Sequence, residues 1–333
     1  MYITVDYSSP LTWLRLVWAV LVALAMLAPL FPVSSASGLW RDAWRRLKRN
    51  RNAMAGYYIV LALMLVASLA NWISRYTPSH QDYDALTQLA AETRAIGGSG
   101  GLRMPDWSEK HWLGVDNLGR DNYARLVHGS VISLEVAVIS QGVSVLIGMA
   151  LGLVAGFYGG WIDAALMAFT EVILAFPFLL LVMTVIAMFG IPSIEMIFVI
   201  IGLVAWPSVA RVIRAQVLGL KQKEFVEAAH ALGASELRIL LVHLLPNVLA
   251  PVIVQVSLGM AGAILSEAGL SFLGFGAQEP IPSWGLMVAK GQGDIDPLWW
   301  LSVFPGICIM LAVFGFNMLG DGLRDALDPR MKS

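Results

Sequence analysis

The sequence predicts an all-α protein that crosses a membrane several times. Hydrophobic residues make up 58% of the 333 residues and charged residues 14%, and the mean hydropathy of +0.71 is far above that of a soluble domain. The apolar residues gather in runs long enough to cross a hydrocarbon core of about 30 Å. Lysines and arginines concentrate in a few of the connections between these runs, as in multi-pass membrane proteins.

Seven apolar runs are candidate spans, at residues 16–33, 54–73, 136–162, 172–188, 194–210, 246–266 and 298–320. A cleaved signal peptide is the usual reading of an early run such as 16–33. The residues from Tyr2 to Leu14 include Asp6 and no lysine or arginine, however, so the basic start of a signal peptide is missing. We therefore expect an extra N-terminal span there, in preference to a re-entrant or surface helix.

The distribution of positive charge predicts the orientation of the spans. Residues 41–51 hold six lysines and arginines in eleven positions, which favours the cytoplasmic side for this segment. Alternation from there places the N-terminus and the segments 74–130, 190–193 and 274–297 outside, and the segments 158–163, 219–246 and 324–333 inside.

The polar stretch 219–246, called the elbow from here on, predicts two short helices joined by a turn. Apolar residues recur at helical spacing over 224–232, and Gly233 supplies the left-handed conformation that ends a helix. A second helix is expected over 235–245, with Ser235 as its N-cap residue and a proline directly after it.

The elbow carries side chains that suit docking into a partner's groove. Small residues allow close approach of the backbone, and carboxylates supply charged contacts. The residues expected on this surface are Glu224, Glu227, Ala228 and Ala229.

The order of residues in the elbow resembles the cytoplasmic coupling loop of ABC importer permeases. The pattern E-A-A, three residues, G and then L-P about ten residues later is met by Glu227, Ala228, Ala229, Gly233, Leu245 and Pro246, with Ala234 after the glycine. His243 and Asn247 match the variant typical of the peptide and nickel branch of that family. The resemblance implies that these residues contact the ATPase subunits. The alternative is an ordinary amphipathic loop with a chance E-A-A.

A second motif lies ahead of the run 136–162. Residues 111–134 resemble the segment that precedes the membrane core in peptide-branch permeases. Alternating acids and arginines predict a self-paired external cap, in which Asp116 or Asp121 neutralises Arg120. We expect a structural role for this cap first, and contact with a delivered binding protein second.

The most specific resemblance lies in residues 266–292, which are similar to a signature of oligopeptide and dipeptide permeases. Fourteen positions match in order: Glu267, Leu270, Ser271, Phe272, Leu273, Gly274, Gly276, Gln278, Pro280, Pro282, Ser283, Trp284, Gly285 and Met287. Two of the glycines are expected to end the span, and the prolines to stiffen an external turn. Trp284 is expected to anchor this turn at the membrane interface.

Three residues in or beside the apolar runs are candidates for a hinge or for the solute pathway: Glu171, Pro177 and Glu267. A carboxylate in a membrane is costly unless it faces the bundle interior or an interface, and a proline frees a backbone carbonyl and allows a kink. A packed kink is the alternative for Pro177. For Glu267, a place on the pathway and pairing with a polar break in the backbone are equal alternatives.

Small residues in the third run predict close packing on another helix. They are Gly142, Gly148, Gly152 and Gly156. At the end of the fifth run, Arg211 and Arg214 are expected to reach the cytoplasmic surface.

No motif for catalysis is present. The sequence has no phosphate-binding loop, no H-E-x-x-H zinc motif and no G-x-S-x-G nucleophile elbow, so we expect no enzymatic activity, no catalytic residue and no metal site. The single cysteine, Cys308, excludes an intrachain disulfide. A net charge of −1 argues against nucleic acid as a partner.

Together the motifs identify the chain as similar to the second permease type of dipeptide, oligopeptide and nickel ABC importers. The resemblance implies a type I, MetI-like transmembrane bundle of about six core helices plus one extra N-terminal helix, in the bacterial inner membrane. The expected segments are the extra span with a basic cytoplasmic loop (1–53), the first core helix (54–73), an external loop (74–130), the permease core with the elbow (131–323) and a cytoplasmic tail (324–333).

The resemblance also implies partners. A homologous permease would complete a heterodimeric pathway, two ABC ATPase subunits would hold ATP and Mg²⁺ and grip the elbow, and an external solute-binding protein would deliver the solute. No cofactor is expected on the chain itself. Peptides are the expected solute, with nickel or other small solutes as the alternative within the branch. An ion-coupled secondary transporter and a non-transporting scaffold or receptor are alternatives from other classes, and co-purification of an ATPase would argue against both.

Overall fold

The computed structural model describes residues 38–85, 87, 110–190, 193–294 and 298–327, and these residues form helices and connections without a strand. The helices are α2 (Gly38–Arg49), α3 (Arg51–Ser68), α4 (Ala70–Ile73), α6 (Asn122–Tyr158), α7 (Gly160–Leu174), α8 (Phe178–Phe189), α9 (Ile194–Lys221), α10 (Glu224–Ala231), α11 (Glu236–Arg238), α12 (Leu245–Phe272), α13 (Trp284–Gly291) and α14 (Trp300–Leu327), with a π-helical turn η1 (Ile239–Leu244) and a 3-10 turn η2 (Gln292–Asp294).

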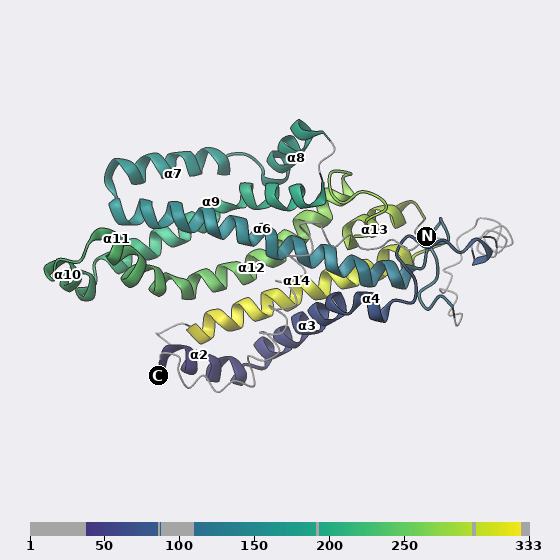
Figure 1. The fold of residues 1–333 in the computed structure, drawn as a ribbon, viewed down its shortest axis with the longest axis horizontal. Helices are drawn as coiled ribbons and strands as arrows, with labels where there is room; N and C mark the ends of the chain where they lie inside the picture. The colour runs from purple at the N-terminus through teal and green to yellow at the C-terminus, as the bar shows by residue number, and fades with distance from the viewer. Residues whose placement is uncertain (1–37, 86, 88–109, 191–192, 295–297, 328–333) are drawn as a thin grey trace.

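The long helices run along the length of the molecule (Figure 1). α6 packs on α9, and α14 packs on both α12 and α3. Helices α2, α10 and α11 lie at one end, called the elbow end, and α4 and α13 lie at the other, called the cap end. Within the part of the chain that the structure describes, five helices are long and apolar enough to span a membrane, or six if the bent pair α7 and α8 is one span. The expected six core spans are thereby confirmed, and the run 16–33 lies outside the described residues.

Two core helices extend well beyond the apolar runs that predicted them. α6 starts at Asn122, because Asp121 caps it by accepting a hydrogen bond from the Ala124 amide at 2.7 Å. The last nine residues of the segment expected to be an external loop, 122–130, are therefore helical. α9 likewise continues past residue 210 to Lys221, so the first residues assigned to the elbow belong to α9.

The basic segment expected to be a cytoplasmic loop instead forms α2. This helix is amphipathic: Ala43 and Leu47 are buried in a cluster with Ala326 of α14, whereas Lys48 and Arg49 are exposed. Burial of this apolar stripe explains why a strongly charged segment is helical rather than irregular.

The span expected over 172–188 is broken. α7 begins at Gly160, directly after Gly159 ends α6, so most of the expected connection 158–163 is helical. α7 and α8 meet at an angle of 87°, with Pro177 at the N-cap of α8. Proline has no amide hydrogen to donate to the preceding turn. The kink expected at Pro177 is therefore a break at which the chain turns by nearly a right angle.

The second helix of the elbow was expected to end before Pro246, but the helical chain continues through this proline. α11, η1 and α12 follow one another without a break from Glu236 to Phe272. Pro246 lies in the first turn of α12, directly after the π-helical turn. Wider turns of this kind accompany places where a residue cannot make the regular α-helical bond, so the chain passes from the elbow into the bundle as a single rod.

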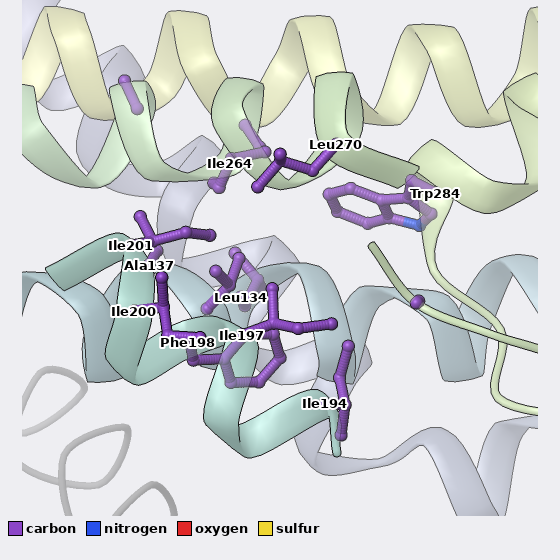
Figure 2. Close-up of a cluster of buried hydrophobic side chains, with 14 of the residues drawn as sticks. Leu134, Ala137, Ile194, Ile197, Phe198, Ile200, Ile201, Ile264, Leu270 and Trp284 are labelled. Carbon is purple, nitrogen blue, oxygen red and sulfur yellow. The ribbon is translucent and has the colours of Figure 1, made fainter. Parts of the chain in front are cut away.

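The main core lies where α6, α9 and α12 meet. Figure 2 shows Leu134 of α6, Phe198 and Ile201 of α9, and Ile264 of α12 pointing toward one another. These side chains are all fully or almost fully buried, and their burial supplies much of the contact between three helices that are distant in sequence.

Trp284 closes this core at the cap end, instead of anchoring at a membrane interface. Its side chain is 1% exposed, its Nε1 donates a hydrogen bond to the Leu126 carbonyl at 3.0 Å, and its backbone amide donates to Ser133 Oγ at 3.2 Å. The prediction of an interface anchor was wrong because the loop of residues 273–283, called the signature loop, folds back onto α6 and places the indole inside the bundle.

Close helix packing on small residues is confirmed for three of the four glycines. Cβ atoms built at Gly148, Gly152 and Gly156 would lie within 3 Å of α9, near Val209, Ile213 and Val217 respectively. Gly142 has open space around its Cβ position, so it does not belong to this contact. The α6 and α9 backbones approach closely over two helical turns, as small residues allow in membrane helices.

Gly152→Val is expected to destabilise the fold, since its Cβ would lie 2.6 Å from the Ala210 carbonyl oxygen. Overpacking of this kind costs about 1–3 kcal/mol. Unfolding in a detergent titration measures the cost, and Gly142→Val is the matched control on the same helix. Equal stability of the two variants would contradict the packing described here.

Candidate functional site

Within the elbow, the end of α9 is followed by helix α10 and a tight turn. After α10, Gly233 adopts a φ of +76°, a conformation that other residues rarely adopt. The Gly233 amide donates to the His230 carbonyl and the Ala234 amide donates to the Ala229 carbonyl, each at 3.0 Å. These bonds satisfy carbonyls at the end of the helix, so the turn has a fixed shape.

One face of α10 anchors the elbow to the bundle. Val226 is 1% exposed and Ala229 is 7% exposed, and both belong to a buried cluster with Ile239 and Leu244 of η1 and Val217 of α9. Ala229 was expected on the docking surface, but it faces inward because it lies three residues after Val226 on the same side of the helix.

The opposite face of α10 and the turn are open. Glu224, Glu227 and Ala228 are exposed, as are Phe225, at 40%, and Leu232, at 88%. Three of the residues expected to form a docking surface, Glu224, Glu227 and Ala228, thus lie together on the exposed face near the turn at Gly233. Large apolar side chains beside carboxylates on a short helix are typical of a helix that docks into a groove.

Leu245 and Pro246 lie apart from that surface. Leu245 packs against the buried cluster under the elbow, and Pro246 is exposed in the first turn of α12. They belong to the rod that follows the elbow. Ser235 has an extended backbone at the start of α11, but its side chain makes no capping hydrogen bond.

A charged pair fastens the helix that leads into the elbow. Arg214 of α9 binds Asp163 of α7 through both carboxylate oxygens, with Nη2 to Oδ2 at 2.6 Å. Lys221 donates to the Phe157 carbonyl at the end of α6. Arg214 was expected to reach the cytoplasmic surface, and the pair with Asp163 was not expected. The sequence feature that could have predicted this pair is Asp163, the one acidic residue in the expected connection 158–163.

At the cap end, Arg120, just before α6, and Arg125, in its first turn, share carboxylates. Arg120 Nε donates to Asp116 Oδ2 at 2.7 Å and Arg120 Nη1 donates to Glu279 Oε2 at 2.6 Å. Arg125 Nη2 donates to Glu279 Oε1 at 3.2 Å. Of the two expected partners of Arg120, the structure selects Asp116 and adds Glu279, which is 159 residues away.

Asp121 has a different role, in the hydrogen-bonding of the loop. Besides capping α6, its Oδ1 lies 2.9 Å from Nδ1 of His111, and Nε2 of His111 lies 3.2 Å from Asp82 Oδ2. The carboxylate of Asp82 also accepts bonds from the Ala85 and Asp84 amides. These backbone bonds, followed by the bond with His111, lower the pKa of Asp82.

The arginine pairs also shift the pKa values of their members. Burial alone would raise the pKa of Glu279, but the hydrogen bond from Arg120 and the charges of Arg125, Arg120 and Lys290 lower it. Burial opposes the charge of Arg120, yet its bonds to Glu279 and Asp116 raise its pKa. The stabilisation from Glu279 is therefore complete above the ordinary pKa of glutamate, about 4.3, and is lost as the pH falls through the lowered value.

The three pathway or hinge candidates lie in different surroundings. Glu171 is exposed on α7 and Pro177 is exposed at the break before α8. Glu267 is fully buried, and its Oε1 accepts a hydrogen bond from Ser271 Oγ at 2.6 Å, which in turn accepts one from the Ala277 amide at 3.0 Å. In this conformation Glu267 ties α12 to the loop that follows it. Among the described residues, no cluster of three or more histidines, cysteines and acids could hold a metal ion.

Glu279→Gln is expected to weaken the cap, because it leaves two buried arginines without their shared charge. Losing a hydrogen-bonded partner of a buried charge costs about 2–3 kcal/mol. Hydrogen exchange at the amides of residues 114–122 measures the loss, with the exposed Asp84→Asn as control. Unchanged protection in the Glu279 variant would show that Asp116 alone holds the arginines.

Comparison with known proteins matches the chain to transport permeases over most of its length. Residues 148–333 match the family described as the binding-protein-dependent transport system inner membrane component. Residues 38–91 match the N-terminal TM domain of oligopeptide transport permease C.

Individual relatives cover nearly the whole chain. The dipeptide transport system permease protein DppC of Alkalihalophilus pseudofirmus is 42% identical over 88% of this chain and 91% of its own length. The glutathione transport system permease protein GsiD of Pectobacterium atrosepticum is 38% identical over 93% and 98%. The oligopeptide transport system permease protein OppC of Haemophilus influenzae is 39% identical over 88% and 89%.

Proposed function

Since the chain belongs to the family of binding-protein-dependent transport system inner membrane components, we propose that it is a permease subunit of an ATP-driven importer of peptides. Membership makes it a multi-pass inner-membrane protein and a transport permease rather than an enzyme. Dipeptides, oligopeptides and glutathione, the solutes in the names of its relatives, share the peptide bond. This common chemistry favours peptides over nickel or other small solutes, and the family assignment favours ATP-driven over ion-coupled transport.

The observation that carries the proposal is the geometry of the elbow. Its buried face fixes α10 on α9 and η1, while Glu227, Phe225 and Leu232 remain exposed at the end of the bundle. The surface is accessible at the end of a folded bundle, and the turn at Gly233 holds it in a fixed shape. These two properties suit contact with an ATPase subunit. We assign this contact to Glu224, Glu227, Ala228 and the turn at Gly233.

Charge supports placing the elbow end in the cytoplasm. The basic helix α2 and the C-terminal end of α14, with Arg324, lie at the same end as α10 (Figure 1). The positive-inside rule applies to such flanking segments. The cap would then face outward, where a solute-binding protein delivers peptide, and the N-terminus would lie outside if 16–33 is a span.

The proposed assembly holds four membrane-associated subunits. A homologous permease completes the pathway, and two ATPase subunits hold ATP and Mg²⁺ and bind one elbow each. ATP binding draws the ATPases together. The continuous rod from Glu236 to Phe272 and the pair between Arg214 and Asp163 carry the displacement of the elbow into α12, α9 and α7. Rigid elements of this kind convert a small movement at one site into a domain rearrangement.

Glu227→Lys is expected to weaken the contact with the ATPase, because it reverses a charge on the exposed face of α10 without touching the buried face. The importer is purified with its operon partners and assayed for bound ATPase and for peptide uptake in vesicles. We expect loss of the bound ATPase, or at least about a tenfold loss of uptake, as for one disrupted charge-assisted contact. The exposed Glu236→Lys, outside the assigned contact, is the matched control.

Gly233→Pro tests the turn of the same elbow. Proline is confined to φ near −65°, whereas Gly233 has +76°, so α10 should lose its orientation. We expect normal membrane insertion and uncoupled hydrolysis. Normal uptake by both the Glu227 and the Gly233 variants would remove the coupling role.

A further inference from the structure

A polar cavity lies midway along the spanning helices. It has a volume of about 190 Å³ and lies between α6, α8, α9 and α12. Its polar lining consists of Gln141, Ser144, Ser208, Gln255 and Ser266. Ser208 is the fifteenth of the 28 residues of α9, so the cavity is far from both the cap and the elbow.

One lining hydroxyl is buried without a hydrogen bond. Ser144 is 0% exposed, and its Oγ has no partner among the described residues. Other buried hydroxyls nearby are satisfied: Ser140, one turn earlier in α6, donates to the Phe198 carbonyl of α9 at 2.8 Å. Serine in a membrane helix usually serves such interhelical or back-bonding roles, so Ser144 requires another explanation.

Gln141 reaches the same cavity through a gap left by a glycine. Its side chain lies over Gly259 of α12, where a Cβ would come within 2.4 Å of Gln141 Oε1. Gln141 is 6% exposed. Burying an amide at this depth is costly unless it finds partners, and the missing side chain at residue 259 is what makes room for it.

The break between α7 and α8 borders this cavity. Phe178, the first residue of α8, lines it, directly after the three residues that separate the two helices. Irregular backbone at membrane depth is tolerated where it is buried in protein or lines a water-filled cavity. The cavity therefore combines a helix break with a polar lining in the middle of the spans.

The lining is neutral. Its polar groups are amides and hydroxyls, with no charged side chain. An amide both donates and accepts hydrogen bonds, and a hydroxyl does the same. These groups complement the N–H and C=O of a peptide backbone and do not select a charged side chain.

We propose that this cavity is a section of the translocation pathway in which Gln141 and Ser144 hydrogen-bond the backbone amides of the passing peptide. The inference rests on the proposed function of peptide import. It assigns the contacts to groups that every peptide shares, so side chains of differing size and charge can follow the same route.

The test uses the complete importer in proteoliposomes with saturating binding protein. The maximal uptake rate is measured for trialanine and for its backbone N-methylated analogue, which lacks amide donors. Gln141→Leu and Ser144→Ala should each lower the rate for trialanine about three- to tenfold, as for one lost hydrogen bond, and should reduce the ratio of the trialanine rate to the analogue rate. The control is Ser257→Ala on α12, whose hydroxyl donates to the Ile253 carbonyl at 3.0 Å and whose Cβ lies near Gly320 of α14.

Wild-type rates and an unchanged ratio in both variants would overturn the inference while leaving peptide import intact. Absence of trialanine uptake by the wild-type importer would instead refute the proposed function. If Gln141→Leu fails to assemble, Ser144→Cys in a Cys308→Ser background gives a second readout. Trialanine should slow the reaction of this thiol with a charged thiol reagent in the assembled importer, and a thiol that trialanine does not protect would overturn the inference.

Discussion

The close contact of α6 with α9 is the constraint on which the rest of the structure depends. Three glycines of α6 bring its backbone against Val209, Ile213 and Val217. From this seam, α9 continues to Lys221 and sets the position of α10, and the pair between Arg214 and Asp163 adds α7. One turn before the seam at Ser144, and two turns before it at Gln141, the same pair of helices lines the polar cavity. One packing arrangement thus fixes the elbow and the proposed pathway relative to each other.

The two ends of the bundle differ in how they use charge. At the cap end, Arg120 and Arg125 are buried and share Glu279, so that the loop before α6 and the signature loop are joined into one unit. At the elbow end, Glu227 is exposed beside large apolar side chains. Satisfied charges stabilise a cap, whereas an open carboxylate beside apolar surface is suited to a partner. This contrast supports the proposal that the cap end is rigid and that the elbow end contacts a partner.

Much of the fold could be predicted from sequence because hydropathy and charge act locally. The six core spans, the turn at Gly233 and the break at Pro177 each depend on a few adjacent residues. The failures have two causes: the early start of α6 has a local signal, the N-cap residue Asp121, which lies outside the apolar run, whereas Trp284 is buried because its loop folds onto the distant helix α6. Sequence periodicity does not reveal that Arg120 pairs with Glu279, which is 159 residues away. It does not reveal the unbonded hydroxyl of Ser144 either, since both depend on which helices meet.

The central claim is that the exposed face of the elbow is the contact with the ATPase. The most direct measurement places a photoreactive amino acid at Leu232, which is 88% exposed beside Gly233, and identifies what it cross-links in the assembled importer. Leu69, which is 46% exposed between α3 and α4 at the cap end, serves as the control position. We predict a cross-link from residue 232 to an ATPase subunit and none from residue 69. An elbow that cross-links only to lipid or to the permease itself would contradict the account.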